Sequence, residues 1–263
     1  MKLAIAQTNI AFENYAENQN TAKAWIEKAA EAKADAIFFP EMSFTGFSMH
    51  VSQIAPYGAD AVHAMRQLAK KQHIAIGFGY VAKAADGRGQ NRYQIVLPSG
   101  EICLDYQKIH PFSYGKEDQY YEKGSRIAVG NLCGVPLSAL ICYDLRFPEV
   151  FRLAAQKASI LLVPANWLAQ RSSHWNTLLR ARAIENQVYV LGINCVGRQN
   201  TLKFLGQSAC YDPEGNCLVQ CDQNASLSYV TIETPVSQFR SAFPTTEDAR
   251  LSWYTAAYQQ LEP

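Results

Sequence analysis

Short apolar runs alternate with amphipathic segments along the chain, and this alternation predicts an α/β fold. Residues 2–7 are rich in strand-forming residues, and apolar residues at helical spacing over 14–33 predict an amphipathic helix. The next run, 36–41, stays apolar up to Glu41, as expected for a strand that is buried on both faces. The first half is completed by a predicted helix at 58–71, a strand at 73–81, and two strands at 91–98 and 101–108 that are joined by a turn.

The second half of the chain repeats this order of elements. Apolar strands are predicted at 135–141 and 159–163, with a helix at 147–157 between them. The remaining predicted elements are a helix at 172–187, a strand at 188–195, a hairpin at 203–221 that turns at 212–215, and a last strand at 227–233. The repetition predicts one domain over 1–263 with internal pseudo-symmetry, in which helices cover two mixed sheets.

The composition of the chain excludes several classes of binding partner. The formal net charge is +1 and no block of like charge occurs, so the sequence predicts neither a nucleic-acid surface nor a membrane surface. Polar residues interrupt the first strand too early for a signal peptide. The seven cysteines are scattered without the close spacing of a zinc site or a disulfide framework. We therefore expect a cytoplasmic protein with a small-molecule partner and no metal or cofactor.

Three chemically capable residues lie at or near the carboxyl ends of predicted strands, where ligands gather in α/β sheets. Glu41, Lys108 and Cys142 each have a structural alternative: a helix cap, a solvated amine and a buried unreactive thiol, respectively. Together they meet the needs of amide cleavage by a thiol. Such a reaction requires a base for the thiol proton, a positive charge near the oxyanion, and a nucleophile.

Three segments around these residues resemble motifs of the nitrilase superfamily of carbon–nitrogen hydrolases, and the resemblance runs over about residues 2–235. The segments are 39–46 (FPEMSFTG), 106–111 (YQKIHP) and 140–149 (LICYDLRFPE). The resemblance implies a four-layer α/β/β/α sandwich of two mixed sheets. It also implies that Glu41, Lys108 and Cys142 form a catalytic triad.

The resemblance assigns further roles. The backbone N–H of Tyr143 would hold the oxyanion, and a second glutamate of the family matches Glu117, with Glu122 as the less favoured alternative. An exposed loop charge is the structural alternative for Glu117. Later segments match as well, and one contains Arg182, Glu185 and Asn186, which would form either a polar brace under the site or an ordinary surface pair.

The segment after Cys142 looks most like the ω-amidase and Nit branch, which hydrolyses ω-amides of dicarboxylates such as α-ketoglutaramate. Such a substrate carries a carboxylate at the far end from its amide. Arg146 is a candidate anchor for that carboxylate, because a guanidinium binds it through two hydrogen bonds. The alternative is a structural ion pair of Arg146 with Asp144 or Glu149.

Other side chains are candidates for contact with the substrate. Phe44, Tyr114 and Trp167 would form the apolar walls of the pocket, with the hydrophobic core as the alternative, favoured for Phe44. His174 opens a predicted helix near the presumed site and is a further candidate contact.

Two other functions remain open at this stage. The same triad would serve an N-carbamoyl-amine hydrolase or a deaminated-glutathione amidase, and a catalytically silent binding protein would keep the fold alone. The resemblance also implies a homodimer or a higher homo-oligomer. The tail at 235–263 is rich in aromatic residues, so we expect it to pack on its own domain or on a partner subunit.

Overall fold

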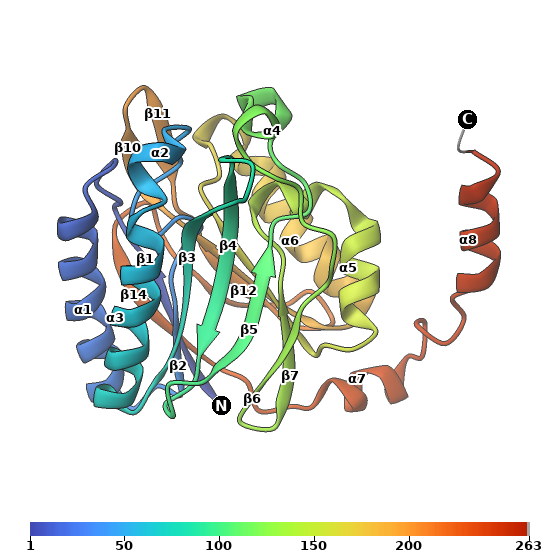
Figure 1. Cartoon of the computed structure of the whole chain (residues 1–263). Helices are drawn as coiled ribbons and strands as arrows, with labels where there is room; N and C mark the ends of the chain where they lie inside the picture. The colour runs from blue at the N-terminus through green and yellow to red at the C-terminus, as the bar shows by residue number, and fades with distance from the viewer. Residues whose placement is uncertain (262–263) are drawn as a thin grey trace.

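Two six-stranded mixed sheets lie at the centre of the structure, a computed structural model that describes residues 1–261 (Figure 1). The first sheet has the strand order β14 (Ser226–Thr231), β1 (Lys2–Gln7), β2 (Ala36–Phe38), β3 (Ala75–Lys83), β4 (Gly89–Val96) and β5 (Ile102–Gln107). The second has the order β13 (Cys217–Gln220), β12 (Ala209–Tyr211), β9 (Tyr189–Asn194), β8 (Ile160–Ala165), β7 (Val135–Ala139) and β6 (Val129–Leu132).

The two sheets have the same pattern of strand directions. In the first sheet β1, β2 and β3 are parallel, and β14, β4 and β5 continue it with antiparallel pairings. In the second sheet β7, β8 and β9 are parallel, and β6, β12 and β13 are added in the antiparallel sense. This correspondence confirms the predicted pair of mixed sheets and shows the internal pseudo-symmetry.

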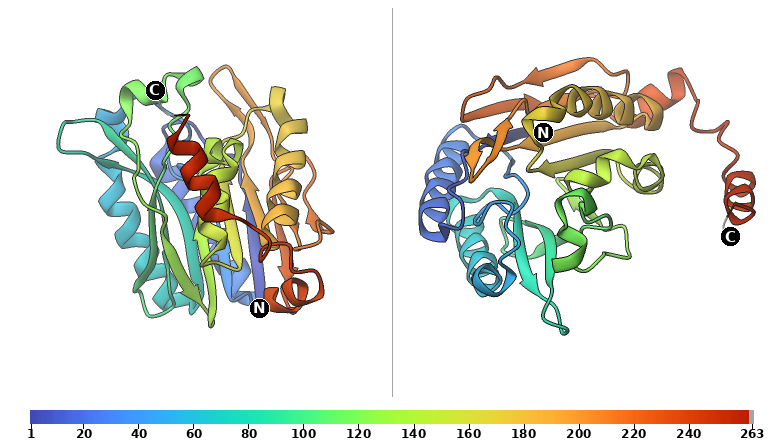
Figure 2. Two further views of the ribbon diagram at one scale, coloured as in Figure 1. Left: turned by 90° about the vertical axis from the view of Figure 1, so that its right-hand side faces the viewer. Right: turned by 90° about the horizontal axis from the view of Figure 1, so that it is seen from above.

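Helices cover the outer face of each sheet and complete four layers (Figures 1 and 2). The first sheet is covered by α1 (Tyr15–Glu31) and α3 (Tyr57–Gln72), and the second by α5 (Pro148–Ala155) and α6 (Ser172–Asn186). Short helical segments connect the layers near the site: α2 (Val51–Ile54), η1 (Ser113–Gly115), α4 (Glu117–Tyr120), η2 (Cys142–Arg146) and η3 (Ala169–Arg171). The predicted α/β/β/α sandwich is thus confirmed.

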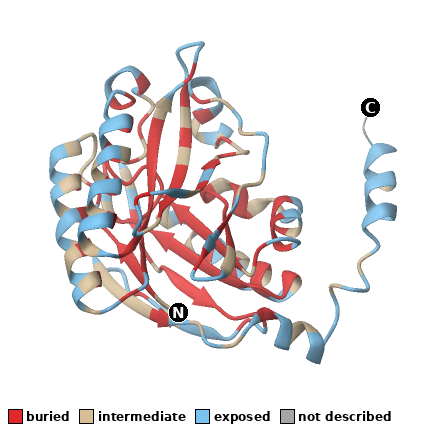
Figure 3. Ribbon diagram, turned by 60° about the horizontal axis from the view of Figure 1, so that its bottom comes forward, coloured by how far each residue is buried: buried red, intermediate tan, exposed pale blue. Residues whose placement is uncertain are grey.

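Successive side chains along β1 point alternately into two hydrophobic cores, one between the two sheets and one between the first sheet and its helices. Leu3 and Ile5 of β1 face the second sheet and belong to the central core, whereas Ala4 and Ala6 belong to the core beneath α1 and α3. Successive side chains of a strand point to opposite faces, so both faces of these strands must be apolar when both are covered. Figure 3 shows buried residues concentrated in the strands and on the inner sides of the helices.

The predicted hairpin at 203–221 is only partly correct. Its turn at 212–215 is present, and Gly215 donates a backbone hydrogen bond to the carbonyl of Asp212. Its first arm, however, is split in two. β11 (Leu202–Leu205) pairs with β10 (Val196–Gln199) as a separate two-stranded sheet, and only β12 joins the second sheet. β6, which no predicted strand covers, pairs antiparallel with β7.

The tail consists of two helices that differ in their packing. α7 (Val236–Ala242) lies on its own domain, where Val236 is buried and Phe239 meets the ring of Tyr189 edge to face. α8 (Leu251–Gln259) stands away from the sandwich and contains no buried residue (Figure 1). Its Tyr258 hydroxyl donates to Glu149. Packing of α8 against a partner subunit stays a prediction.

Across residues 1–261, no helix has both the length and the apolar character that a membrane span requires.

Gly79 of β3 allows the segment that carries Glu41 to approach the first sheet. A Cβ at Gly79 would lie 2.4 Å from the backbone nitrogen of Met42 and 2.9 Å from the Cα of Glu41. Ser43 fixes the same segment, because its N–H donates to the Gly79 carbonyl and its Oγ accepts from the Gly79 N–H. The position of Glu41 therefore depends on a strand that contributes no catalytic group.

We expect Gly79→Ala to lower both stability and activity. The added methyl group must displace backbone atoms, which costs about 1–3 kcal/mol, and the displacement moves Glu41. Chemical unfolding and amide turnover measure the two effects. Lys83→Ala, at the exposed end of the same strand, is the control and should change stability by less than about 0.5 kcal/mol. Unchanged turnover in a folded Gly79→Ala protein would contradict the assigned packing.

Candidate active site

The three predicted strand-end residues converge in the structure. Glu41 lies three residues past β2, Lys108 directly follows β5, and Cys142 begins η2 beyond β7. The Lys108 ammonium is 2.7 Å from Glu41 Oε1, and both side chains are buried. Lys108 and Cys142 line the same cavity.

Glu117 is the second carboxylate partner of Lys108. Its Oε2 lies 2.8 Å from Lys108 Nζ and accepts a 2.6 Å hydrogen bond from the backbone N–H of Phe112. Glu117 is completely buried in α4, so it is not an exposed loop charge. Glu122 lies elsewhere, half-buried, and accepts from the Gln90 amide.

Asn91, on β4, joins the two carboxylates. Its Nδ2 donates to Glu41 Oε1 at 2.8 Å and to Glu117 Oε1 at 2.9 Å. The amide orientation follows from this, because the opposite orientation would place an oxygen against two carboxylates. Asn91 was not predicted from the sequence, since within a strand it resembles any other polar position.

Asn166 fixes Glu41 from the second sheet. Its backbone N–H donates to Glu41 Oε2 at 2.9 Å, and its Nδ2 donates to the Glu41 carbonyl at 2.8 Å. Gln199 in turn donates to Asn166 Oδ1 at 2.8 Å. Asn166 follows β8, so hydrogen bonds to Glu41 link the two sheets.

Cys142 has a left-handed backbone with φ +47°, which is unusual for a residue other than glycine. Asp144 supports this turn. Its Oδ2 accepts from the N–H of Ile141 and from the Tyr106 hydroxyl, each at 2.8 Å, and its Oδ1 accepts from the N–H of His110. The strained conformation persists because its surroundings determine it. Asp144 is a second supporting residue whose role the sequence did not reveal.

Arg182 contacts η2, the segment that begins at Cys142. This buried side chain donates through Nη2 to the carbonyl of Leu145 at 2.8 Å and pairs through Nη1 with Glu185 at 3.0 Å. Asn186 donates to the Arg182 carbonyl. The contact with η2 favours the polar brace over the surface pair.

Burial and nearby charges perturb the ionisable groups of the site. Burial raises the pKa of the Cys142 thiol well above its usual value; Glu41 raises it further, and Lys108 opposes this. Burial lowers the pKa of Lys108, but Glu117 and Glu41 outweigh it and hold that pKa well above the usual value. Burial raises the pKa of Glu117, although Lys108 lowers it. The resting site therefore holds a protonated thiol beside a lysine cation.

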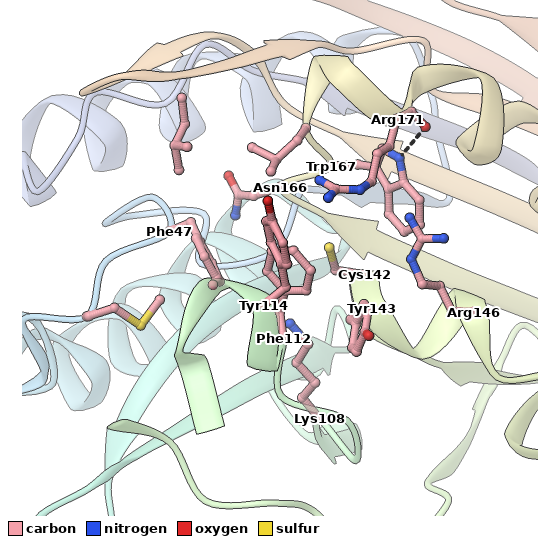
Figure 4. A pocket seen from close by; sticks show the side chains of 14 residues that line it. Phe47, Lys108, Phe112, Tyr114, Cys142, Tyr143, Arg146, Asn166, Trp167 and Arg171 are labelled. Atoms are coloured by element: carbon pink, nitrogen blue, oxygen red, sulfur yellow. Dashed lines mark hydrogen bonds between the residues drawn. The ribbon is translucent and has the colours of Figure 1, made fainter. Parts of the chain in front are cut away.

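A cavity of about 350 Å³ ends at Cys142 (Figure 4). This volume suits a small molecule. Aromatic side chains form much of its wall, together with Lys108 and two arginines. The lining residues are Phe47, Met49, Lys108, Phe112, Tyr114, Gly115, Cys142, Tyr143, Arg146, Asn166, Trp167, Leu168, Arg171 and Leu202.

The predicted substrate contacts divide into two groups. Arg146, Trp167 and Tyr114 line the cavity, and Tyr114 is largely exposed. Phe44 and His174 do not line it. Phe44 belongs to the core beneath α1 and α3, which agrees with the alternative favoured for it. His174 was expected to contact the substrate, but it is exposed and its Nδ1 lies 3.4 Å from both terminal nitrogens of Arg146.

The structural alternative for Arg146 is not observed. Asp144 is engaged by Tyr106, His110 and Ile141, and Glu149 accepts from Tyr258. Instead, the Arg146 guanidinium lies over the Trp167 ring, 4.8 Å from its centroid.

Within residues 1–261, no cluster of three or more His, Cys, Asp or Glu residues has a geometry that could hold a metal ion.

Comparisons with known proteins identify relatives over most of the chain. The family model described as "Carbon-nitrogen hydrolase" matches residues 2–240. A 2-oxoglutaramate amidase of Bacillus subtilis is 33% identical over 256 residues, covering 96% of this chain and 98% of the relative. Omega-amidase YafV of Escherichia coli is 34% identical and covers 82% of this chain and 84% of that protein.

Solved structures agree with this result. XC1258 of Xanthomonas campestris, described as a CN-hydrolase superfamily protein with an arsenic adduct in its active site, has a TM-score of 0.89 and 28% identity, and the match covers 95% and 97% of the two chains. An amidase of Nesterenkonia AN1 has a TM-score of 0.88 over 97% of each chain. At 23% identity, this second likeness supports the fold alone.

We expect Cys142 to carry no thiolate at neutral pH. The ultraviolet thiolate absorbance of wild type minus that of Cys142→Ala isolates this thiol from the other six. Because burial raises the Cys142 pKa, this difference should appear only at a higher pH than the absorbance of an ordinary cysteine thiolate. Because Glu41 raises the Cys142 pKa, Glu41→Gln should move the thiolate signal to lower pH while it lowers turnover.

Glu122→Gln, which changes a glutamate outside the site, is the control and should leave the titration unchanged. A thiolate signal in wild type at about pH 7, or an unshifted curve in Glu41→Gln, would contradict the assigned electrostatics.

Proposed function

We propose that this chain, which belongs to the carbon–nitrogen hydrolase family, is a thiol-dependent amidase that converts the terminal amide of a small dicarboxylate ω-amide to a carboxylate and ammonia. One observation carries the proposal. A lysine cation held between two buried carboxylates lies beside a thiol at the inner end of a cavity of ligand size.

Acylation follows from the placement of the groups. Glu41 takes the proton of Cys142 as Sγ attacks the amide carbonyl, because a protonated thiol of raised pKa needs a base. Lys108 and the N–H of Tyr143 hold the oxyanion. Tyr143 lies in the first turn of η2, where N–H groups lack helical partners. Glu41 then returns the proton to the leaving nitrogen, which departs as ammonia and leaves a thioester.

In the second half of the reaction, water hydrolyses the thioester and the proton returns to Cys142. Glu41 takes a proton from water as its oxygen attacks the thioester carbonyl, and the thiolate of Cys142 departs and regains the proton. Glu117 keeps the Lys108 ammonium in place through its 2.8 Å contact and orients the water through the same network. Water supplies the second oxygen of the new carboxylic acid, which loses its proton to the released ammonia or to solvent, and the enzyme returns to its starting state.

The substrate class is supported by the relatives and by the cavity. The two curated relatives are named for 2-oxoglutaramate and for ω-amides. Arg146 lines the cavity with no carboxylate partner in the described part of the chain, so it is available to bind the distal carboxylate of such an amide. The cytoplasmic location and the homodimer stay predictions.

Ammonia release from α-ketoglutaramate tests the proposal. Wild type should turn it over with a higher kcat/KM than N-carbamoyl amines or deaminated glutathione, and Cys142→Ala should lose the activity by a factor of about 10⁴ or more. Mass spectrometry after rapid quenching should find an acyl adduct on wild type and none on Cys142→Ala.

Cys133→Ala, which removes an exposed thiol remote from the cavity, is the matched control and should retain full activity. Ammonia accompanied by carbon dioxide from an N-carbamoyl amine, with little from α-ketoglutaramate, would instead indicate a carbamoylase. Binding of amides without any turnover would indicate a silent binding protein.

A further inference from the structure

We propose that Arg171 is a specificity residue that, together with Arg146, binds the anionic 2-oxo acid end of the substrate and rejects amides that carry an ammonium group beside the carboxylate. This inference rests on the proposed function, because it concerns the end of the same substrate that lies away from Cys142. Arg171 was not among the site residues predicted from the sequence.

The backbone of Arg171 is fixed against the cavity wall. It ends η3, its N–H donates to the carbonyl of Leu168, and its carbonyl accepts a 2.8 Å hydrogen bond from Trp167 Nε1. Its guanidinium carbon lies 4.9 Å from the centroid of the Tyr114 ring. Arg171 and Arg146 line the same cavity, and the Arg146 guanidinium lies over the Trp167 ring (Figure 4). Trp167 thus contacts both residues, through its ring with Arg146 and through Nε1 with the Arg171 backbone.

Neither guanidinium has an anionic partner in the part of the chain that the structure describes. The ion pairs within residues 1–261 include neither Arg146 nor Arg171. Nη1 of Arg171 is buried and has no hydrogen-bond partner among these residues. Both arginines line the cavity, so an anionic ligand bound there would supply the partner that the protein does not.

The two cations also influence each other. Burial lowers the pKa of Arg146, and the charge of Arg171 lowers it further. Two like charges kept close together at a cavity produce a field that attracts an anion and repels a cation. Lys108 contributes little to this field, because it is neutralised by Glu41 and Glu117.

The chemistry of the ligand follows from this field. A 2-oxo acid end presents three acceptor oxygens and no donor, which suits two guanidinium groups that only donate. The corresponding amino acid amide, glutamine, carries an ammonium group in place of the oxo oxygen. That ammonium would meet both arginines, so the same pair that binds α-ketoglutaramate disfavours glutamine.

The test compares kcat/KM for three amides in wild type and Arg171→Gln: α-ketoglutaramate, glutamine and uncharged butyramide. The variant should lower the ratio of α-ketoglutaramate to butyramide by about 10- to 100-fold, as expected for a lost charge-assisted contact. The ratio of α-ketoglutaramate to glutamine should fall as well. Arg171→Lys, which keeps the charge, should retain part of both ratios.

Arg198→Gln is the matched control, because Arg198 is exposed and does not line the cavity, and it should leave both ratios unchanged. Equal loss on all three amides would assign Arg171 a structural role, and unchanged ratios would make it a solvated side chain. Either result overturns the inference.

A binding measurement separates this inference from the proposed function. Glutarate titrated into Cys142→Ala, followed by tryptophan fluorescence, should bind at least about 10-fold more weakly when Arg171→Gln is added. If wild type fails to hydrolyse α-ketoglutaramate but this difference is found, the anion site stands and the proposed substrate falls. If wild type hydrolyses it and the difference is missing, the proposed function stands and the role of Arg171 falls.

Discussion

Burial of the Lys108 ammonium is the constraint on which the site depends. A single buried cation is strongly unfavourable, and two carboxylates within 2.8 Å compensate for it. Two carboxylates around one cation leave an excess negative charge, which the Asn91 amide and the N–H groups of Asn166 and Phe112 stabilise. Removing Lys108 would leave two buried carboxylates without a cation, and removing any other member would leave a buried polar group without a hydrogen-bond partner, so the network holds its members in one geometry.

This network also explains why the site needs both sheets. Glu41, Asn91 and Lys108 come from the first sheet, whereas Asn166 and Cys142 follow strands of the second. The hydrogen bonds from Asn166 to Glu41 therefore fix Glu41, the proposed base, relative to Cys142, the proposed nucleophile at the end of the other sheet. Pseudo-symmetry supplies two similar sheets, and the site forms where their strand ends meet. Small displacements between the sheets would separate reacting groups, which catalysis tolerates poorly.

Sequence patterns predict what depends on local chemistry. Glu41, Lys108 and Cys142 were predictable because strand ends gather ligands, and the paired sheets were predictable because apolar runs repeat. Asn91 was not, since its partners lie 50 and 26 residues away and only the packed structure brings them together. The prediction of a single hairpin over 203–221 was partly wrong for a similar reason. Whether β11 joins β10 or the second sheet is decided by tertiary contacts, which alternation of residues does not encode.

In the proposed reaction, the distribution of charge in the cavity would orient the substrate. Lys108 and two carboxylates form a fully buried group with an excess of negative charge, beside a neutral thiol. Another part of the wall is occupied by Arg146 and Arg171. Both are half-buried, and neither forms an ion pair with a carboxylate of residues 1–261. A monoanionic amide lowers its energy by placing the carboxylate at the arginines, and this leaves the neutral amide at Cys142. The same arrangement would draw the new carboxylate away from Glu41 once hydrolysis has made a second anion, because like charges repel at the inner end. Orientation of the substrate and release of the product then have one electrostatic cause.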